Sequence, residues 1–245
     1  MFGKKCKALA MVVAVTGIVV GSGVWPEREV SADAVSRIDQ AYVIQIEHTY
    51  VTHDGVSAYR RGGDSLGTAV APNIILTHNH FHKPPEPAQD ETLTFLDPTR
   101  AALSLPVEGL PFVAIDGGTA LIYLPGTVAL PGAPISNRST VEHLAIGDRL
   151  TVCYWDDDGE RLAQQDFEII RIEDGVATLA DPDRIINPGD SGGGALFEGR
   201  LVGNTWAMHA DSKGNPTGTF DVALLPAQVL NLLEMTENET GNGAQ

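Results

Sequence analysis

A serine set among glycines is the feature of this chain best suited to do chemistry. Residues 187–193 are Asn-Pro-Gly-Asp-Ser-Gly-Gly, with Ser191 supplying the hydroxyl. Because glycine adopts positive φ angles that other residues resist, such a loop can turn two backbone N–H groups toward one point. An acyl-transfer site needs this arrangement, since negative charge develops on a substrate oxygen about 3 Å from the donors. The alternative interpretation is a plain hairpin loop, because these residues are also common in turns.

A histidine cluster upstream could supply the base that a serine hydroxyl needs at neutral pH. The apolar run Ile74–Leu76 leads into Thr-His-Asn-His at residues 77–80, and His82 follows. His78, His80 and His82 alternate, so an extended chain would put them on one side. That alternation is also compatible with a zinc site. No second His or Cys cluster in the sequence completes such a site, so we expect no metal and no cofactor.

The elements that must position these residues are short strands. Apolar and β-branched runs, such as Ile74–Thr77, Val176–Ala180 and Leu201–Trp206, are separated by Asp-Gly and other Gly-rich breaks. Regularly spaced short strands with turn signals predict an all-β barrel or sandwich. Residues Pro226–Met235 predict one helix, because proline opens it and apolar residues follow at helical spacing. The segment Pro125–Ser139 is rich in Pro, Gly and Ser and predicts a connection between two halves.

The histidine and serine segments together resemble those of the chymotrypsin-like (trypsin-like) serine peptidases. Residues 77–80 resemble the family's Thr-x-x-His motif, in which the last histidine is the general base. Residues 189–193 match its Gly-Asp-Ser-Gly-Gly nucleophile motif, and Thr-Trp-Ala at 205–207 resembles its Ser-Trp-Gly substrate-lining strand. The order histidine before serine agrees with the family. The scarcity of cysteine is similar to the bacterial secreted branch of the family, and the resemblance covers about Gly67–Leu233.

This resemblance implies two six-stranded antiparallel β-barrels with the site in the cleft between them, plus a C-terminal helix. Residues 35–128 would hold an N-terminal segment and the first barrel, and residues 129–245 the second barrel, the helix and a tail. It implies that Ser191 is the nucleophile and His80 the general base. The backbone N–H groups of Gly189 and Ser191 would form the oxyanion hole.

The resemblance also assigns five residues to the substrate pocket, namely Ile185, Thr205, Trp206, Ala207 and Gly218. Ile185 stands where trypsin-type enzymes carry an aspartate, so cleavage after Lys or Arg is not supported. Ala207 replaces a glycine of the family and should narrow the pocket. We therefore expect small or medium apolar side chains to fit there.

The third member of the Ser-His-Asp triad is where this chain departs from the family. The family carries Asp-x-Ala-Leu on a strand after the histidine, whereas alignment on the Ala-Leu pair puts Gly118 at the aspartate position. We expect Asp116, two residues earlier, to reach His80 through a bulge formed by two glycines. Asp97 or Asp90 could substitute for it, or the position is empty.

The N-terminus predicts export. Residues 1–34 carry Lys4, Lys5 and Lys7 near their start, continue with the apolar run Ala8–Val24 and end in Ala-x-Ala, which is typical of a cleaved signal peptide. An uncleaved membrane anchor is the alternative, although the run is short for a bilayer span. We expect a secreted, extracellular protein that meets a membrane only if this segment is kept.

Charge and cysteine content narrow the partners. The 245 residues carry 32 acidic and 16 basic side chains, for a net charge of −16. This balance argues against nucleic acid, because phosphate binding needs a basic face. Cys6 lies in the predicted signal, so Cys153 would have no intrachain disulfide partner. We expect a monomer whose partner is a peptide or protein substrate.

The sequence therefore predicts a secreted serine endopeptidase that hydrolyses peptide bonds through an acyl-enzyme on Ser191. The alternative is a catalytically impaired homologue, degenerate at the third triad position, that binds peptides or proteins in the same cleft. A carboxylate within hydrogen-bond reach of His80 would favour the first hypothesis.

Overall fold

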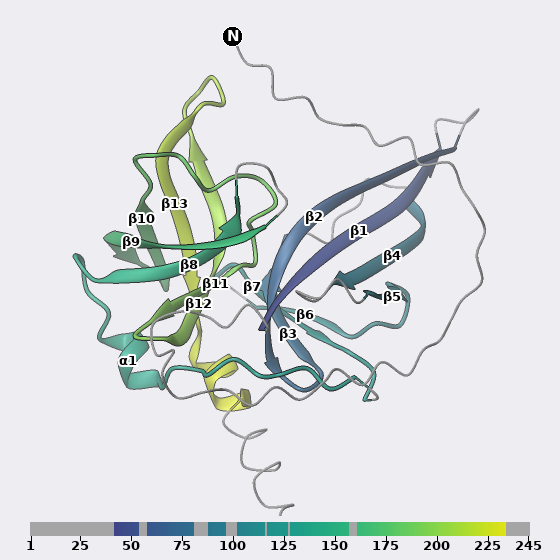
Figure 1. The fold of residues 1–245 in the computed structure, drawn as a ribbon, viewed down its shortest axis with the longest axis horizontal. Helices are drawn as coiled ribbons and strands as arrows, with labels where there is room; N and C mark the ends of the chain where they lie inside the picture. The colour runs from purple at the N-terminus through teal and green to yellow at the C-terminus, as the bar shows by residue number, and fades with distance from the viewer. Residues whose placement is uncertain are drawn as a thin grey trace, which may run out of the picture.

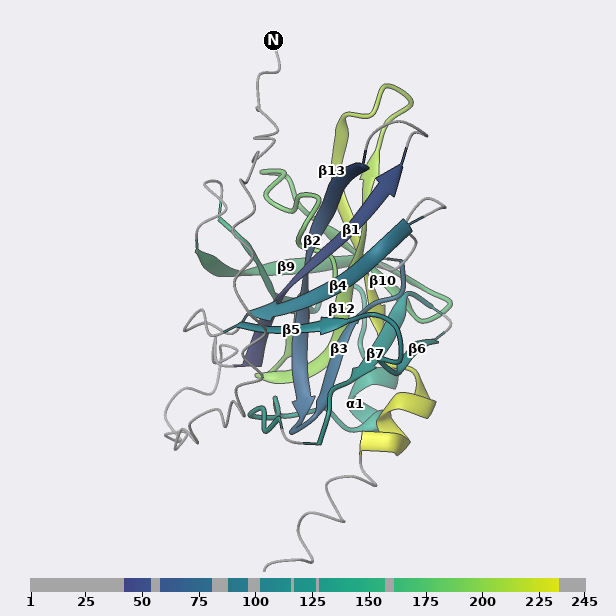
Figure 2. The ribbon, with the colours of Figure 1, turned by 90° about the vertical axis from the view of Figure 1, so that its right-hand side faces the viewer.

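The computed structural model describes residues 42–53, 58–80, 88–96, 102–115, 117–126, 128–156 and 161–233, which form two packed β-units (Figure 1 and Figure 2). The predicted signal, residues 1–34, lies outside these ranges, and so do Asp116, Asp97 and His82. No helix within the described ranges has the length and apolar character needed to cross a membrane.

The first half is one curled antiparallel sheet with the strand order β5-β4-β1-β2-β3-β7-β6. Its strands are β1 (Val43–His53), β2 (Ala58–Ala71), β3 (Ile74–His78), β4 (Ala88–Leu96), β5 (Ala102–Pro106), β6 (Phe112–Ile115) and β7 (Thr119–Tyr123). Alternate residues of β1 turn inward, so that Ile44 and Ile46 pack with Ile75, Phe95 and Ile122 inside the curl. Burial of these apolar side chains is the main stabilisation of the sheet.

This half has seven strands in an open curl, where we expected six strands in a closed barrel. Its edges, within the described residues, are β5 and β6. β5 exposes every second residue, and no residue of the four-residue strand β6 is buried. Two short edge strands with so little buried surface offer little with which to close a barrel.

The second half is a closed six-stranded barrel in the order β10-β13-β12-β11-β8-β9. Its strands are β8 (Arg149–Trp155), β9 (Leu162–Glu173), β10 (Val176–Ala180), β11 (Gly194–Phe197), β12 (Arg200–Ala210) and β13 (Pro216–Leu224). Inside it, Phe167 and Phe220 meet edge to face with ring centroids 5.0 Å apart, a favourable aromatic geometry. The predicted all-β class, with two β-units and a C-terminal helix, is confirmed.

Two helices accompany the barrel. The five-residue helix α1 (Arg138–Glu142) was not expected, since it starts within the Pro- and Gly-rich connection. Asn137 caps it, because its side-chain oxygen accepts the N–H of Thr140 at 2.8 Å. The C-terminal helix covers residues 227–233 and buries three apolar side chains.

The two halves meet along β2, β3 and β7 on one side and β11 and β12 on the other (Figure 1). The N–H of Leu66 on β2 donates to the carbonyl of Ser191 at 2.8 Å. The hydroxyl of Thr119 on β7 donates to the side-chain oxygen of Asn204 on β12 at 2.9 Å, and both residues are fully buried. This contact surface fixes the segment around Ser191 against the strands of the first half.

Candidate active site

Ser191 lies in a loop that precedes β11, here called the nucleophile loop (residues 187–193). The N–H of Asp190 donates to the carbonyl of Asn187 at 3.1 Å, and Gly189 has a φ of +108°. These are features of a type II turn, which favours proline at its second position and glycine at its third. The sequence Asn-Pro-Gly-Asp supplies both, so local chemistry dictates the backbone immediately before Ser191.

The carboxylate of Asp190 anchors the nucleophile loop to the barrel. One oxygen accepts the N–H of Trp155 on β8 at 2.8 Å, and the other accepts the N–H of Asn187 at 2.6 Å. Burial raises the pKa of this carboxyl to about 6, against the opposite effect of the two N–H donors. A buried acid that accepts two backbone hydrogen bonds holds the turn in one conformation.

Gly192 brings the loop closer to the first half than a residue with a side chain could. It has a φ of +90°, and a Cβ there would overlap the carbonyl of Leu66 and the hydroxyl of Thr77. Its N–H donates to the carbonyl of Thr205 on β12 at 2.7 Å. The loop is therefore held against strands of both halves.

Two backbone donors next to the Ser191 hydroxyl remain available. The N–H groups of Asp190, Gly192 and Gly193 all donate to protein carbonyls, whereas those of Gly189 and Ser191 donate to no described residue. Buried N–H groups normally find an acceptor. An acceptor supplied by a bound molecule would therefore be stabilised at the position that the resemblance assigns to an oxyanion hole.

The predicted base lies two residues beyond the end of β3, in a segment here called the histidine turn (residues 77–80), which includes the last two residues of that strand. Asn79 fixes this turn, since its N–H donates to the carbonyl of Gly118 at 3.2 Å and its side-chain amide donates to the carbonyl of Ile115 at 3.4 Å. His80 is exposed, and its ring centroid lies 4.1 Å from that of His78. The imidazole of His80 thus lies at the surface above a second, buried imidazole.

His78 is not suited to act as the base. It is 2% exposed, and burial, with a smaller contribution from the charge of His80, lowers its pKa to about 3. A group with that pKa stays neutral at physiological pH and cannot hold a proton there. His78 therefore serves as a neutral support for the ring of His80.

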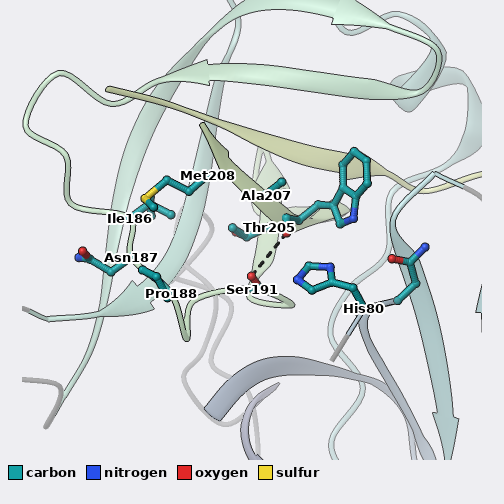
Figure 3. A pocket seen from close by; sticks show the side chains of 10 residues that line it. His80, Ile186, Asn187, Pro188, Ser191, Thr205, Ala207 and Met208 are labelled. Carbon is teal, nitrogen blue, oxygen red and sulfur yellow. Dashed lines mark hydrogen bonds between the residues drawn. The ribbon is translucent and has the colours of Figure 1, made fainter. Parts of the chain in front are cut away.

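His80 and Ser191 lie on one cavity of about 510 Å³, here called the first cavity (Figure 3). The imidazole of His80 points toward the Ser191 hydroxyl. That hydroxyl donates to the carbonyl of Trp206 at 3.4 Å, a long and therefore weak hydrogen bond. The Ser191 hydroxyl is therefore only weakly held by this carbonyl, on the side of the cavity that His80 faces.

The walls of the first cavity carry no Asp, Glu, Lys or Arg among the described residues. They are formed by Asn79, His80, Ile186, Asn187, Pro188, Ser191, Thr205, Trp206, Ala207 and Met208. A mostly apolar cavity with a few polar groups is the usual form of a site for an uncharged ligand group.

Of the five residues predicted to line the substrate pocket, the structure brings three together. Thr205, Trp206 and Ala207 line the first cavity, and Ile185 and Gly218 do not. Ile185 is half-buried beside it, and Gly218 has a φ of +82° on β13.

The carboxylate of Asp181 explains why Ile186, and not the expected Ile185, lines the first cavity. Its two oxygens accept the N–H groups of Ile185 and Ile186, each at 3.0 Å. This fixes the segment with Ile186, not Ile185, at the cavity. A Cβ on Gly218 would lie 3.1 Å from the Asp181 carbonyl oxygen, so Gly218 packs on this segment instead of lining the cavity.

Met208 also lines the first cavity, although the sequence did not indicate it, because β12 is irregular at this point. The pairing of β12 with β13 shifts register between Thr205 and Ala207, which is a β-bulge or a similar irregularity. Such a shift breaks the alternation of a strand, so that neighbouring side chains reach the same side. No local sequence signal marked it.

At position 118, where the resemblance places an aspartate, this chain has a glycine that a tryptophan side chain covers. Gly118 has a φ of +104°, and a Cβ there would lie 2.6 Å from Cγ of the Trp206 indole. The indole therefore covers the place that a side chain at Gly118 would take. Asp90 lies on β4, three strands from β3 in the sheet. Asp116, the expected third member, lies outside the described residues.

The fold is similar to that of chymotrypsin-like and HtrA-type serine proteases. The scabies mite inactivated protease paralogue S-I1 superposes with a TM-score of 0.54 and 12% identity, covering 81% of this chain and 95% of that one. The paralogue S-D1 gives 0.54 and 13%, covering 81% and 93%. The HtrA-type protease AlgW with tripeptide gives 0.53 and 16%, covering 82% and 62%. No protein-family model and no curated protein sequence matches this chain.

Proposed function

We propose that this chain is a serine endopeptidase that forms an acyl-enzyme on Ser191. The observation that carries the proposal is the shared cavity, at which His80 from the first half points toward Ser191 from the second. Two backbone N–H groups beside the same serine have no described protein acceptor. A nucleophile, a base and a pair of oxyanion donors are the parts that acyl transfer needs.

In the proposed reaction, the imidazole of His80 takes the proton of Ser191 as the hydroxyl oxygen attacks the carbonyl carbon of a peptide bond. The charge that develops on the carbonyl oxygen is stabilised by the N–H groups of Gly189 and Ser191. Protonated His80 then gives its proton to the leaving amine as the C–N bond breaks. Water, deprotonated by His80, repeats the sequence and releases the acyl group.

The substrate is a peptide or protein with a small or medium apolar residue before the cleaved bond. Ile186, Ala207 and Met208 supply apolar walls, and no ionised carboxylate or amine among the described residues lines the first cavity. Such walls favour an apolar side chain, because a charged one would lose its hydration without gaining a partner.

The rate of the proposed enzyme depends on whether a carboxylate orients His80. An orienting carboxylate fixes the tautomer of the imidazole, and its loss lowers turnover by about 10⁴ in well-studied Ser-His-Asp enzymes. Trp206 covers the position at Gly118 where the resemblance expects that carboxylate.

We also propose that the protein acts outside the cell, as a monomer. The support is the basic, apolar and Ala-x-Ala pattern of residues 1–34. Cys153, which is a free cysteine buried on β8 against residues of the first half, is compatible with export without a disulfide at this position.

A second candidate function is peptide binding without cleavage. The indole over Gly118 favours it, since it occupies the expected place of a catalytic carboxylate. A peptide could then bind in the first cavity and leave uncleaved.

Hydrolysis of matched apolar substrates decides between the two functions. An N-acetyl apolar amino acid methyl ester and a peptide with the same residue would be incubated with the purified protein, with Ser191→Ala and with His80→Ala. His143→Ala, which removes an exposed histidine next to α1, is the matched control. We expect hydrolysis by the wild type and the control only. Binding of the peptide by a folded wild type that cleaves neither substrate would contradict the proposal and support the binding module.

A further inference from the structure

A second cavity adjoins the first. It has a volume of about 240 Å³ and is formed by His48, Gly63, Asp64, Ser65, His78, His80, Pro188, Gly189 and Ser191. His80, Pro188 and Ser191 line both cavities, so they form the ridge between them. A peptide bond attacked by Ser191 crosses this ridge, with one side of the substrate at each cavity.

The first cavity suits the residue before the cleaved bond, because it is the larger and carries the apolar walls of Ile186 and Met208. The second cavity then lies under the residues after the bond, which leave with the amine. This assignment rests on the proposed function, since it assumes that Ser191 attacks a peptide bond.

Asp64 gives the second cavity its charge. It is the only Asp or Glu among the described residues that line this cavity, and no Lys or Arg is among them. The carboxylate makes no hydrogen bond or ion pair with any other part of the protein that the structure describes. Burial raises the pKa of this carboxyl, with no donor or cation acting against it.

The neighbouring acids differ from Asp64 because the protein satisfies them. Glu91 accepts from, or pairs with, Nε2 of His48 at 2.7 Å. Asp190 accepts two backbone N–H groups. Asp64 is exposed at the wall of the cavity, so its carboxylate is accessible to a cation that arrives with a ligand, and it has no donor among the described residues to compete with that cation.

We propose that Asp64 selects substrates that carry Lys or Arg at the first or second position after the cleaved bond. The cationic end of such a side chain pairs with the Asp64 carboxylate in the second cavity, while its methylene stem lies along the ridge. The net charge of −16 attracts cationic segments to the protein before they bind.

Peptides that differ at one residue test this assignment. A series with one apolar residue before the bond and Lys, Ala or Glu at the first or second position after it would be cleaved by the wild type and by Asp64→Asn. We expect kcat/KM to be about fivefold higher for Lys than for Ala in the wild type, as for a partly exposed ion pair. The ratio should fall to about one in Asp64→Asn, and Asp64→Lys should favour Glu.

Asp174→Asn is the matched control, since Asp174 is an exposed turn acid with a φ of +50° that asparagine tolerates. It removes the same charge and should leave the Lys-to-Ala ratio at its wild-type value. A preference that survives in Asp64→Asn, or that disappears equally in Asp174→Asn, would overturn the assignment to Asp64.

Hydrolysis of the apolar methyl ester by the wild type separates failure of this inference from failure of the proposed function. The ester has only a methoxy group after the cleaved bond, so the second cavity plays no part in its hydrolysis. If the ester and the peptides both stay intact, the same series is tested for binding to Ser191→Ala by fluorescence anisotropy. A fivefold tighter Kd for Lys than for Ala, lost on adding Asp64→Asn, supports the inference. Equal Kd values for Lys and Ala contradict it.

Discussion

The nucleophile loop and the histidine turn meet at one cavity, but the protein holds them in different ways. The nucleophile loop is fastened from inside by the buried Asp190 carboxylate and by a glycine pressed between strands of both halves. The histidine turn ends in the exposed His80, which lies on a neutral, buried His78. Hydrogen bonds fix the nucleophile loop in one conformation. The orientation of the His80 ring in the histidine turn depends on the side chains that pack around it.

If the protein is the proposed peptidase, this difference indicates which of the two regions limits catalysis. Donors for an oxyanion need a rigid backbone, and the nucleophile loop provides one. A base needs its imidazole in one tautomer and orientation. The Trp206 indole covers Gly118, the position at which the resemblance places the carboxylate for that task. Under the proposed function, the nucleophile loop would supply the acyl-transfer site, and the histidine turn would limit the rate.

Adding a methyl group at Gly192 tests the fastening of the nucleophile loop and should have the largest effect. In Gly192→Ala the new Cβ meets the Leu66 carbonyl and the Thr77 hydroxyl at a positive φ. Strain and overpacking together should lower the free energy of unfolding by about 5 kcal/mol. Gly175→Ala, also at positive φ but with open space around it, should cost only about 1 kcal/mol. Urea denaturation of both measures the difference, and equal losses would show that the loop is not tightly packed.

Acidic pH should destabilise the folded chain through the buried His78 of the histidine turn. Since the pKa of His78 is about 3 in the folded chain and near 6.5 when unfolded, only the unfolded chain binds this proton between those values. The stabilisation is therefore complete above pH 6.5 and declines as the pH falls toward 3, by on the order of 4 kcal/mol. His78→Leu should remove this acid dependence, whereas His143→Leu should keep it. Denaturation midpoints from pH 4 to pH 7 provide the measurement, and unchanged acid dependence in His78→Leu contradicts the account.

The nucleophile loop should respond to pH with the opposite sign. The pKa of Asp190 is about 6 in the folded chain against 3.8 as its ordinary value, so the folded chain holds the proton in that window. Its contribution to stability is complete below pH 3.8 and is lost as the pH rises through 6, by on the order of 3 kcal/mol. Asp190→Asn should abolish this slope. Denaturant titrations at pH 4, 5 and 6 would reveal the change, and a slope retained in the variant would count against burial as the cause.

A carboxylate introduced at Gly118 should have the smallest effect of the series on stability and none on activity. In Gly118→Asp the side chain collides with the Trp206 indole at a positive φ, and the variant should lose about 2 kcal/mol. Combining it with Trp206→Ala removes the collision, so the two changes should be non-additive by about 1 kcal/mol or more. A faster methyl ester hydrolysis by Gly118→Asp alone would show that the indole yields easily to a carboxylate.

The sequence was sufficient for the parts of the site that rest on local chemistry. Proline, glycine and aspartate in residues 187–190 favour one turn wherever they occur, so the nucleophile loop could be predicted. The apolar strand predicted that a histidine cluster would be presented at its end, and the resemblance to the Thr-x-x-His motif singled out His80 within it. The all-β class followed from short runs and turn residues in the same way.

What could not be predicted depends on contacts between distant residues. Ile186 lines the first cavity in place of Ile185 because of hydrogen bonds to the Asp181 carboxylate. Met208 lines it because of a register shift in β12. The indole over Gly118 comes from the other half of the chain. The closure of a sheet likewise depends on how much surface its edge strands bury, which explains why the first half curls without closing.

The measurement that tests the central claim most directly is the rate at which a fluorophosphonate probe labels the folded protein. If His80 activates Ser191, intact mass and peptide mapping will show one label on Ser191. The labelling rate will fall by about 100-fold or more in His80→Ala and stay at the wild-type value in His143→Ala. A folded wild type that takes no label, or one labelled as fast without His80 as with it, would contradict the claim that these two residues form a catalytic pair.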